Sequence, residues 1–224
     1  MDIRIEKALA AALAAYEKAL KKTDDSFSAQ LKSVFNSEEG FLQKVDQLDE
    51  VLDNYPVYED LREVLFDLLL MNFFAADVER LEEDYLESEE WESIEEQTID
   101  RGTELLNLLL YLRECIDEKI SPSLEDFLKE FLLVDDDEFQ DEYRIYEPML
   151  ANQLLIDSGY REIQQVAGKL DQNQELTELF YPTMSFFSEM QPSSAQFEAY
   201  IEASQNKAFD AAIYAMLVTY NEDK

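Results

Sequence analysis

The sequence predicts an all-α protein, and three observations support that prediction. The chain of 224 residues contains only four glycines and five prolines, fewer than a fold with many tight turns needs. Leu, Ala and Glu, which are good helix formers, are abundant. Apolar residues recur every three or four positions, as amphipathic helices require. We therefore expect a compact array of about nine or ten amphipathic helices, and a single domain spanning residues 1–224 because 46% of the residues are hydrophobic.

Four helices are expected in the first third of the chain. The first covers residues 1–22, where five bases and three acids give a charge of +2, and a second reaches Phe35. A third ends at Tyr55, because the residue before a proline avoids the helical region. The helix that starts at Val57 is apolar on nearly all sides, so we expect it to be central. Asp67 and Asn72 on this helix are expected to lie at its exposed edge, or to be hydrogen-bonded if they are buried.

The remaining helices follow an acidic stretch. An apolar stripe runs from Leu105 to Ile120, and Ser121-Pro122-Ser123 ends that helix. Further helices are expected over residues 124–134, 143–157, 160–170, 176–190 with an interruption at Pro182, 195–203 and 208–220.

The acidic stretch, residues 77–100, is the main candidate for a binding surface. Twelve acids and the single base Arg80 give it a charge of −11, and it contains the only tryptophan of the chain. An aromatic side chain within an acidic rim suits a basic peptide or protein surface. The alternative is that this tryptophan anchors the acidic helix to the core. The candidate partner-binding residues are Glu89, Glu90, Trp91, Glu92, Glu95 and Glu96.

The net charge of −34 restricts the classes of partner. Nucleic-acid binding depends on Lys and Arg that displace counterions, and anionic membranes attract the same residues. We therefore expect neither nucleic acid nor membrane as a partner, and we expect a basic protein or peptide instead. Selection for solubility or adaptation to salt would also account for the acidity. The oligomeric state is not predicted.

The absence of histidine, with a single cysteine, excludes most nucleophilic and zinc chemistry. An enzyme built on this chain would rely on carboxylates and a hard cation such as Mg²⁺. The residues spaced for that role are Glu59, Asp60 and Glu63, together with Glu114 and Asp117. This spacing resembles the paired acidic patches of all-α nucleotide pyrophosphohydrolases of the MazG and dUTPase type. The resemblance implies Mg²⁺ as cofactor and a nucleotide as substrate, although no cluster of Lys or Arg accompanies the acids.

The function predicted from these observations is a non-enzymatic interaction protein whose acidic face binds a basic partner. Its charge is similar in character to that of immunity proteins, inhibitors and chaperones, and no cofactor is expected. The Mg²⁺-dependent hydrolase is the alternative. The start of the chain lacks a signal-peptide pattern, and the longest apolar run, Val64–Ala76, is too short for a bilayer. A cytoplasmic location is therefore expected.

An internal similarity suggests two related helical halves. Residues 53–61 resemble residues 141–149 (141 − 53 = 88), and residues 106–127 align with residues 176–197 (176 − 106 = 70). A duplication of residues 53–131 as residues 141–201, with an acidic insertion near 82–100 in the first copy, accounts for both offsets. The alternative is chance similarity between amphipathic helices.

Overall fold

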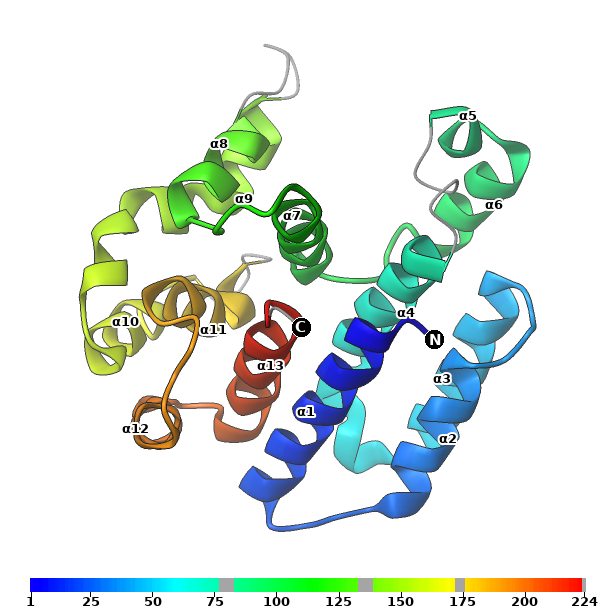
Figure 1. Cartoon of the computed structure of the whole chain (residues 1–224), viewed down its shortest axis with the longest axis horizontal. Coiled ribbons are helices and arrows are strands. Elements are labelled where there is room, and N and C mark those ends of the chain that lie inside the picture. The colour runs from blue at the N-terminus through cyan, green and yellow to red at the C-terminus, as the bar shows by residue number, and fades with distance from the viewer. Residues whose placement is uncertain (77–82, 133–138, 172–175, 223–224) are drawn as a thin grey trace.

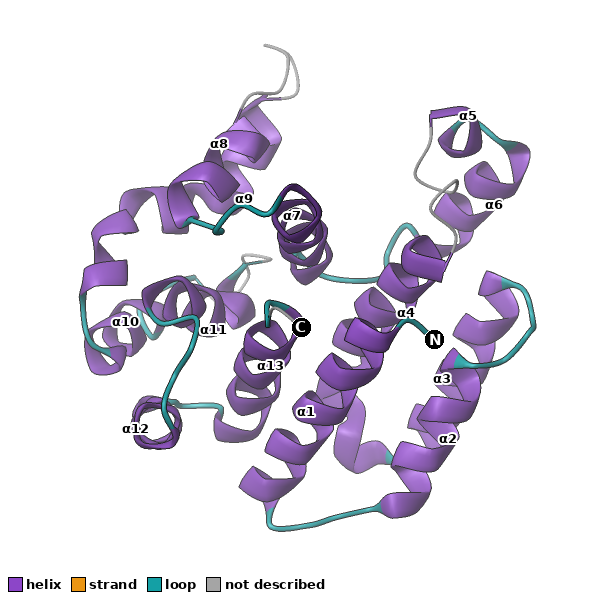
Figure 2. Ribbon diagram, in the orientation of Figure 1, coloured by secondary structure: helices purple, strands orange, loops and turns teal. Residues whose placement is uncertain are grey.

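The all-α fold class is confirmed by a computed structural model that describes residues 1–76, 83–132, 139–171 and 176–222. Every regular element in these ranges is a helix (Figures 1 and 2). The helices outnumber the nine or ten expected because several predicted helices are divided. The helix expected from Val57 is one example, since it begins as a short 3₁₀ helix.

The N-terminal part of the fold is a set of helices with acidic caps. Asp2 and Asp24 precede the first two helices, and each carboxylate accepts hydrogen bonds from two backbone amides of the first turn. Lys21 ends the first helix in the left-handed conformation. The elements are α1 (Ile3–Leu20), α2 (Asp25–Phe35), α3 (Phe41–Asn54), η1 (Pro56–Leu61) and α4 (Arg62–Ala76).

The middle of the chain contains the acidic stretch and two further helices. The elements are α5 (Glu83–Leu86), α6 (Glu89–Thr98), α7 (Leu105–Glu118) and α8 (Leu124–Leu132). Lys119 adopts a left-handed conformation that ends α7 before Ile120. Ile120, which was expected on the buried stripe of this helix, is therefore 52% exposed, and that part of the prediction is wrong.

The C-terminal part of the described chain consists of six helices. The elements are α9 (Phe139–Ala151), η3 (Gln153–Asp157), α10 (Tyr160–Ala167), α11 (Thr177–Ser188), α12 (Ser194–Ala203) and α13 (Lys207–Tyr220). Of these, α11 and α13 are the most extensively buried. The interruption expected at Pro182 is wrong, because the proline lies inside α11. Residues 179–187 are buried continuously, so their packing outweighs the hydrogen bond that the proline cannot make.

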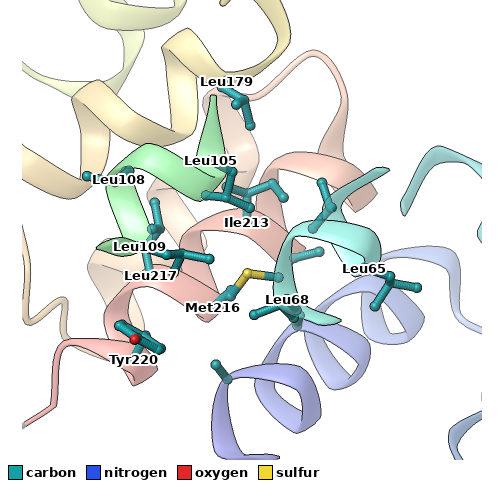
Figure 3. Close-up of a cluster of buried hydrophobic side chains, with 14 of the residues drawn as sticks. Leu65, Leu68, Leu105, Leu108, Leu109, Leu179, Ile213, Met216, Leu217 and Tyr220 are labelled. Atoms are coloured by element: carbon teal, nitrogen blue, oxygen red, sulfur yellow. The ribbon is translucent and has the colours of Figure 1, made fainter. Parts of the chain in front are cut away.

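The hydrophobic core is formed where helices from distant parts of the sequence meet. Figure 3 shows Leu68 of α4 beside Met216 of α13, and Leu105 and Leu109 of α7 beside Ile213 and Leu217 of α13. The central position predicted for α4 is supported by burial along most of its length. The first and last helices, α1 and α13, pack side by side (Figure 1). The basic helix α1 is thus docked on the body of the protein.

The duplication remains a prediction. Helices α8 and α12 begin at Leu124 and Ser194, which are 70 residues apart (194 − 124 = 70) and agree with the second offset. In the first offset, however, the 3₁₀ helix η1 is matched with the α-helix α9. Superposition of residues 53–131 on residues 141–201 tests the relation.

Candidate protein-binding surface

The acidic helix α6 begins with a favourable arrangement of polar groups. The Ser88 hydroxyl accepts a hydrogen bond from the Trp91 amide at 3.2 Å and so caps the helix. Three glutamates occupy the first turn, where the helix dipole favours negative charge. These local interactions make residues 89–98 helical even though the segment carries little apolar surface.

One side of α6 is held on the end of α4 by aromatic contacts. The ring of Trp91 lies 5.4 Å from that of Phe74 and 6.2 Å from that of Tyr85, measured between centroids. Ile94, one turn later, is only 3% exposed. Trp91 thus acts as an anchor between α6 and the core, while its ring stays partly exposed.

Five glutamates on the remaining surface of α6 are exposed. They are Glu89, Glu90, Glu92, Glu95 and Glu96, and we call them, together with Trp91, the α6 face. Glu95 and Glu96 lie in the last turn, which has no basic residue and where negative charge opposes the helix dipole. Glu92 also has like-charged neighbours three or four residues away on both sides, and such pairs destabilise a helix.

A network of ion pairs fixes the segment that leads out of α6. Arg101 donates to the Asp49 carboxylate at 3.0 Å and to the Glu63 carboxylate at 3.0 Å. Arg62 binds the other oxygen of Asp49 at 2.7 Å. Both arginines are therefore occupied by internal partners, and neither lies on α6.

Asp67 continues this attachment inside the protein. Its carboxylate is fully buried and accepts the Thr103 amide at 3.1 Å and the Thr103 hydroxyl at 2.5 Å. Burial raises the pKa of Asp67 to about 8, although the hydrogen bonds from Thr103 act in the opposite direction. The expected exposure of Asp67 and Asn72 is wrong, because both side chains are buried. The alternative expectation, that they would be hydrogen-bonded if buried, is confirmed: Asn72 is 4% exposed and accepts the Asp2 amide at 2.8 Å.

Gly102 allows the backbone to approach Asp67. Its φ of 86° lies in the region that favours glycine. A Cβ atom at this position would lie 2.6 Å from Asp67 Oδ1. We call residues 101–103, with their partners Asp49, Glu63 and Asp67, the latch. Sequence reasoning missed the latch, although a lone Arg-Gly pair between an acidic and an apolar helix was a possible signal.

The carboxylates proposed for Mg²⁺ are divided between different partners. Glu59 is paired with Arg62 at 2.8 Å, and Glu63 is paired with Arg101 in the latch. Asp60 is exposed, and on α7 the Asp117 carboxylate lies 3.9 Å from Arg113. Glu114 is exposed. The pKa of Glu130 is raised first by the burial of Glu130 and then by the neighbouring Glu114 carboxylate. Across the residues that the structure describes, no group of three or more acidic or cysteine side chains is arranged to hold a metal ion.

Comparison of this chain with protein-family models, with curated proteins and with solved structures finds no match. The description of the α6 face therefore depends on its own geometry. No helix in the described ranges is both long enough and apolar enough to cross a membrane.

Proposed function

We propose that this chain is a non-enzymatic interaction protein whose α6 face binds a basic protein or peptide. The observation that carries the proposal is that α6 exposes five glutamates and contains no lysine or arginine. Two of these glutamates lie in the last turn of the helix, where negative charge is unfavourable because of the helix dipole. A cationic partner would reduce the repulsion among neighbouring glutamates such as Glu92, Glu95 and Glu96. The proposal concerns binding and includes no catalytic step.

The position of the α6 face supports this proposal. In Figure 1, α5 and α6 lie at the edge of the molecule, beyond the C-terminal end of α4. Trp91 provides a partly exposed aromatic surface among the carboxylates, and such a ring attracts Lys and Arg side chains. The latch at residues 101–103 fixes the segment that follows α6, and a surface that is held in place loses less conformational entropy on binding.

Trp91 makes the proposal directly measurable. It is the only tryptophan of the chain, so its fluorescence reports on α6 without interference from other tryptophans. We expect a lysine- and arginine-rich peptide to change the emission of Trp91 in a saturable way at low salt. Binding should weaken strongly between about 0.01 and 0.5 M salt, because the Debye length falls from about 30 Å to less than 10 Å over that range.

A charge-matched pair of variants separates the α6 face from general acidity. The first variant replaces Glu89, Glu90, Glu92, Glu95 and Glu96 with Gln. The second replaces five exposed acids elsewhere with the corresponding amides, at Glu38, Glu39, Asp46, Glu118 and Glu198. Both variants change the net charge by +5. We expect the first to lose at least tenfold in affinity and the second less than threefold.

The native partner is found with the same variants. Affinity capture from the source cell is carried out with the unmodified chain and with both variants, and the retained proteins are identified by mass spectrometry. The proposal expects a basic protein that the control variant keeps and the α6 variant loses, and that changes Trp91 emission when purified. Equal loss of binding in both variants would refute a dedicated α6 face and leave only non-specific charge attraction.

A further inference from the structure

A small polar cavity lies between α10, α11 and the start of α13, far from α6 in Figure 1. Its volume is about 180 Å³. The polar side chains that line it are Gln164, Thr177, Glu178, Gln205, Asn206 and Asp210. Most pockets for drug-sized ligands have volumes of roughly 300 to 1,000 Å³. The cavity therefore suits the head group of a small molecule.

Gln164 provides an unused hydrogen-bond acceptor at this cavity. The residue is 8% exposed, and its Oε1 atom is buried without a hydrogen-bond partner in the part of the chain that the structure describes. Buried amide oxygens are nearly always hydrogen-bonded in folded proteins, because an unsatisfied acceptor is costly. Because Gln164 also lines the cavity, rotation of its side chain would present this acceptor to a ligand that donates an N–H or O–H group.

The charge of the cavity indicates that the donor is cationic. Asp210 is 5% exposed, and its Oδ2 atom accepts the Ser204 hydroxyl at 2.6 Å. Burial raises the pKa of Asp210 to about 6, so the carboxylate is still ionised above neutral pH. Glu178 adds a second carboxylate at the exposed side. None of the described residues that line the cavity is a lysine or an arginine, so the two carboxylates are not neutralised from its walls.

We propose that this cavity binds a small organic cation through an ammonium or guanidinium head group, whose N–H groups donate to Gln164 Oε1 and to the Asp210 carboxylate. Charge-assisted hydrogen bonds of this kind are stronger than neutral ones. A metal ion fits the cavity poorly, because Mg²⁺ and Ca²⁺ need six or more oxygen ligands and the described residues hold no metal-binding group of three acids. The site is separate from the α6 face and adds a second binding activity to the chain.

The proposal is tested by nuclear magnetic resonance with ¹⁵N-labelled protein. The chain has four glycines, and Gly168 is the one that lines the cavity. The probes are n-butylguanidinium, n-butylammonium and the neutral n-butylurea. We expect the two cations to shift the Gly168 amide in a saturable way while Gly40 and Gly102 stay unchanged. Binding of n-butylurea should be at least tenfold weaker. Equal binding of all three probes, or an unchanged Gly168 signal, would overturn the proposal.

A matched pair of variants keeps the test independent of folding. Gln164→Leu removes the unsatisfied acceptor, so we expect a higher melting temperature together with at least a tenfold loss of cation binding. Gln165→Leu makes the same change at an exposed neighbour and should bind within twofold of the unmodified chain. Glu178→Gln should weaken binding about threefold without a change in stability. A Gln164→Leu variant that binds the cations normally would contradict the proposed contact.

A final comparison identifies the source of the head group. N-acetylarginine N-methylamide represents an arginine side chain of a protein, and n-butylguanidinium represents a free small molecule. Similar affinities for the two probes assign the site to a protein side chain. A loss of more than tenfold for the capped amino acid assigns it to a free amine or guanidine. Each result supports the cation site, whereas failure of both probes to bind refutes it.

Discussion

Asp67 is a carboxyl group enclosed by the core of an acidic protein. Its partners are the amide and hydroxyl of Thr103, and no base contributes to the shift of its pKa to about 8. The folded pKa lies above the ordinary value of 3.8. The folded state therefore binds the proton more tightly than the unfolded chain. The stability that this group contributes is complete below about pH 4 and is lost as the pH rises through 8.

Asp67→Asn should remove this part of the pH dependence. The amide has a similar shape and can keep a hydrogen bond to Thr103, but it does not titrate. We expect the unmodified chain to lose several kcal/mol between pH 5 and pH 8 that the variant does not lose, as measured by urea unfolding. Asp210, whose pKa is raised to about 6, remains in both proteins and cancels in the difference. Parallel pH profiles for the two proteins would show that Asp67 is ionised in the folded state.

Gly102 is the position where backbone geometry constrains the sequence. Gly102→Ala introduces a Cβ atom 2.6 Å from Asp67 Oδ1 at a φ of 86°. We expect a loss of about 1–3 kcal/mol in the free energy of unfolding. Gly159→Ala is the matched control, because its φ of −83° is open to any residue and its Cβ would meet only the end of the flexible Glu162 side chain. Equal losses of stability for the two substitutions would contradict the close approach of Gly102 to Asp67 in the latch.

Helix α6 is an element whose stability depends on one aromatic anchor. Only Ile94 of this helix is buried, and Trp91 packs on Phe74 and Tyr85. The glutamates that make α6 a candidate binding surface also make it weak as an isolated helix. The function proposed for α6 therefore requires that its attachment be provided by residues outside the helix.

Trp91→Ala should loosen α6 without unfolding the rest of the protein. We expect a cost of about 2 kcal/mol, below the range for a fully buried tryptophan because Trp91 is partly exposed. Hydrogen exchange should show faster exchange at amides 89–98 and unchanged exchange in α13. Trp91→Phe keeps most of the packing and should behave nearly like the unmodified chain. Exchange that increases evenly across all helices would indicate that α6 is not a separate unit.

At the scale of the whole molecule, repulsion between acidic side chains opposes folding, and burial of one continuous hydrophobic core favours it. A net charge of −34 disfavours the compact state, whereas the burial of α4, α7, α11 and α13 against one another stabilises it. The packing of α1 on α13 joins the two ends of the described chain. Ion pairs at Arg62 and Arg101 relieve only a small part of the charge.

Salt should therefore stabilise the protein as a whole. We expect the melting temperature to rise by several degrees between about 0.01 and 0.5 M NaCl, because screening weakens repulsion between exposed acids more than attraction within half-buried pairs. KCl should have the same effect if screening is the cause. A melting temperature that falls with added salt would show that the ion pairs of the latch dominate the electrostatic energy.

Sequence periodicity was sufficient for most of the fold. Phe41, Val45, Leu48 and Leu52 recur at helical spacing and are buried on α3, and α4 is central because it is apolar on nearly all sides. Local polar signals mark some helix starts, since the Asp24 and Ser193 side chains cap α2 and α12. Pro182 was misjudged because its tolerance depends on the burial of α11, which is a property of the packed protein.

The sequence by itself determined the fold class, the excess of negative charge and the exposed glutamates of α6, because helical spacing and charge are properties of neighbouring residues. Only the tertiary structure decided that Trp91 rests on Phe74, that Thr103 binds Asp67, and that Gln164 and Asp210 line one cavity. The residues of these three pairs are 17, 36 and 46 positions apart in the sequence (91 − 74, 103 − 67 and 210 − 164). Such pairings follow from the packing of whole helices, which local spacing does not encode.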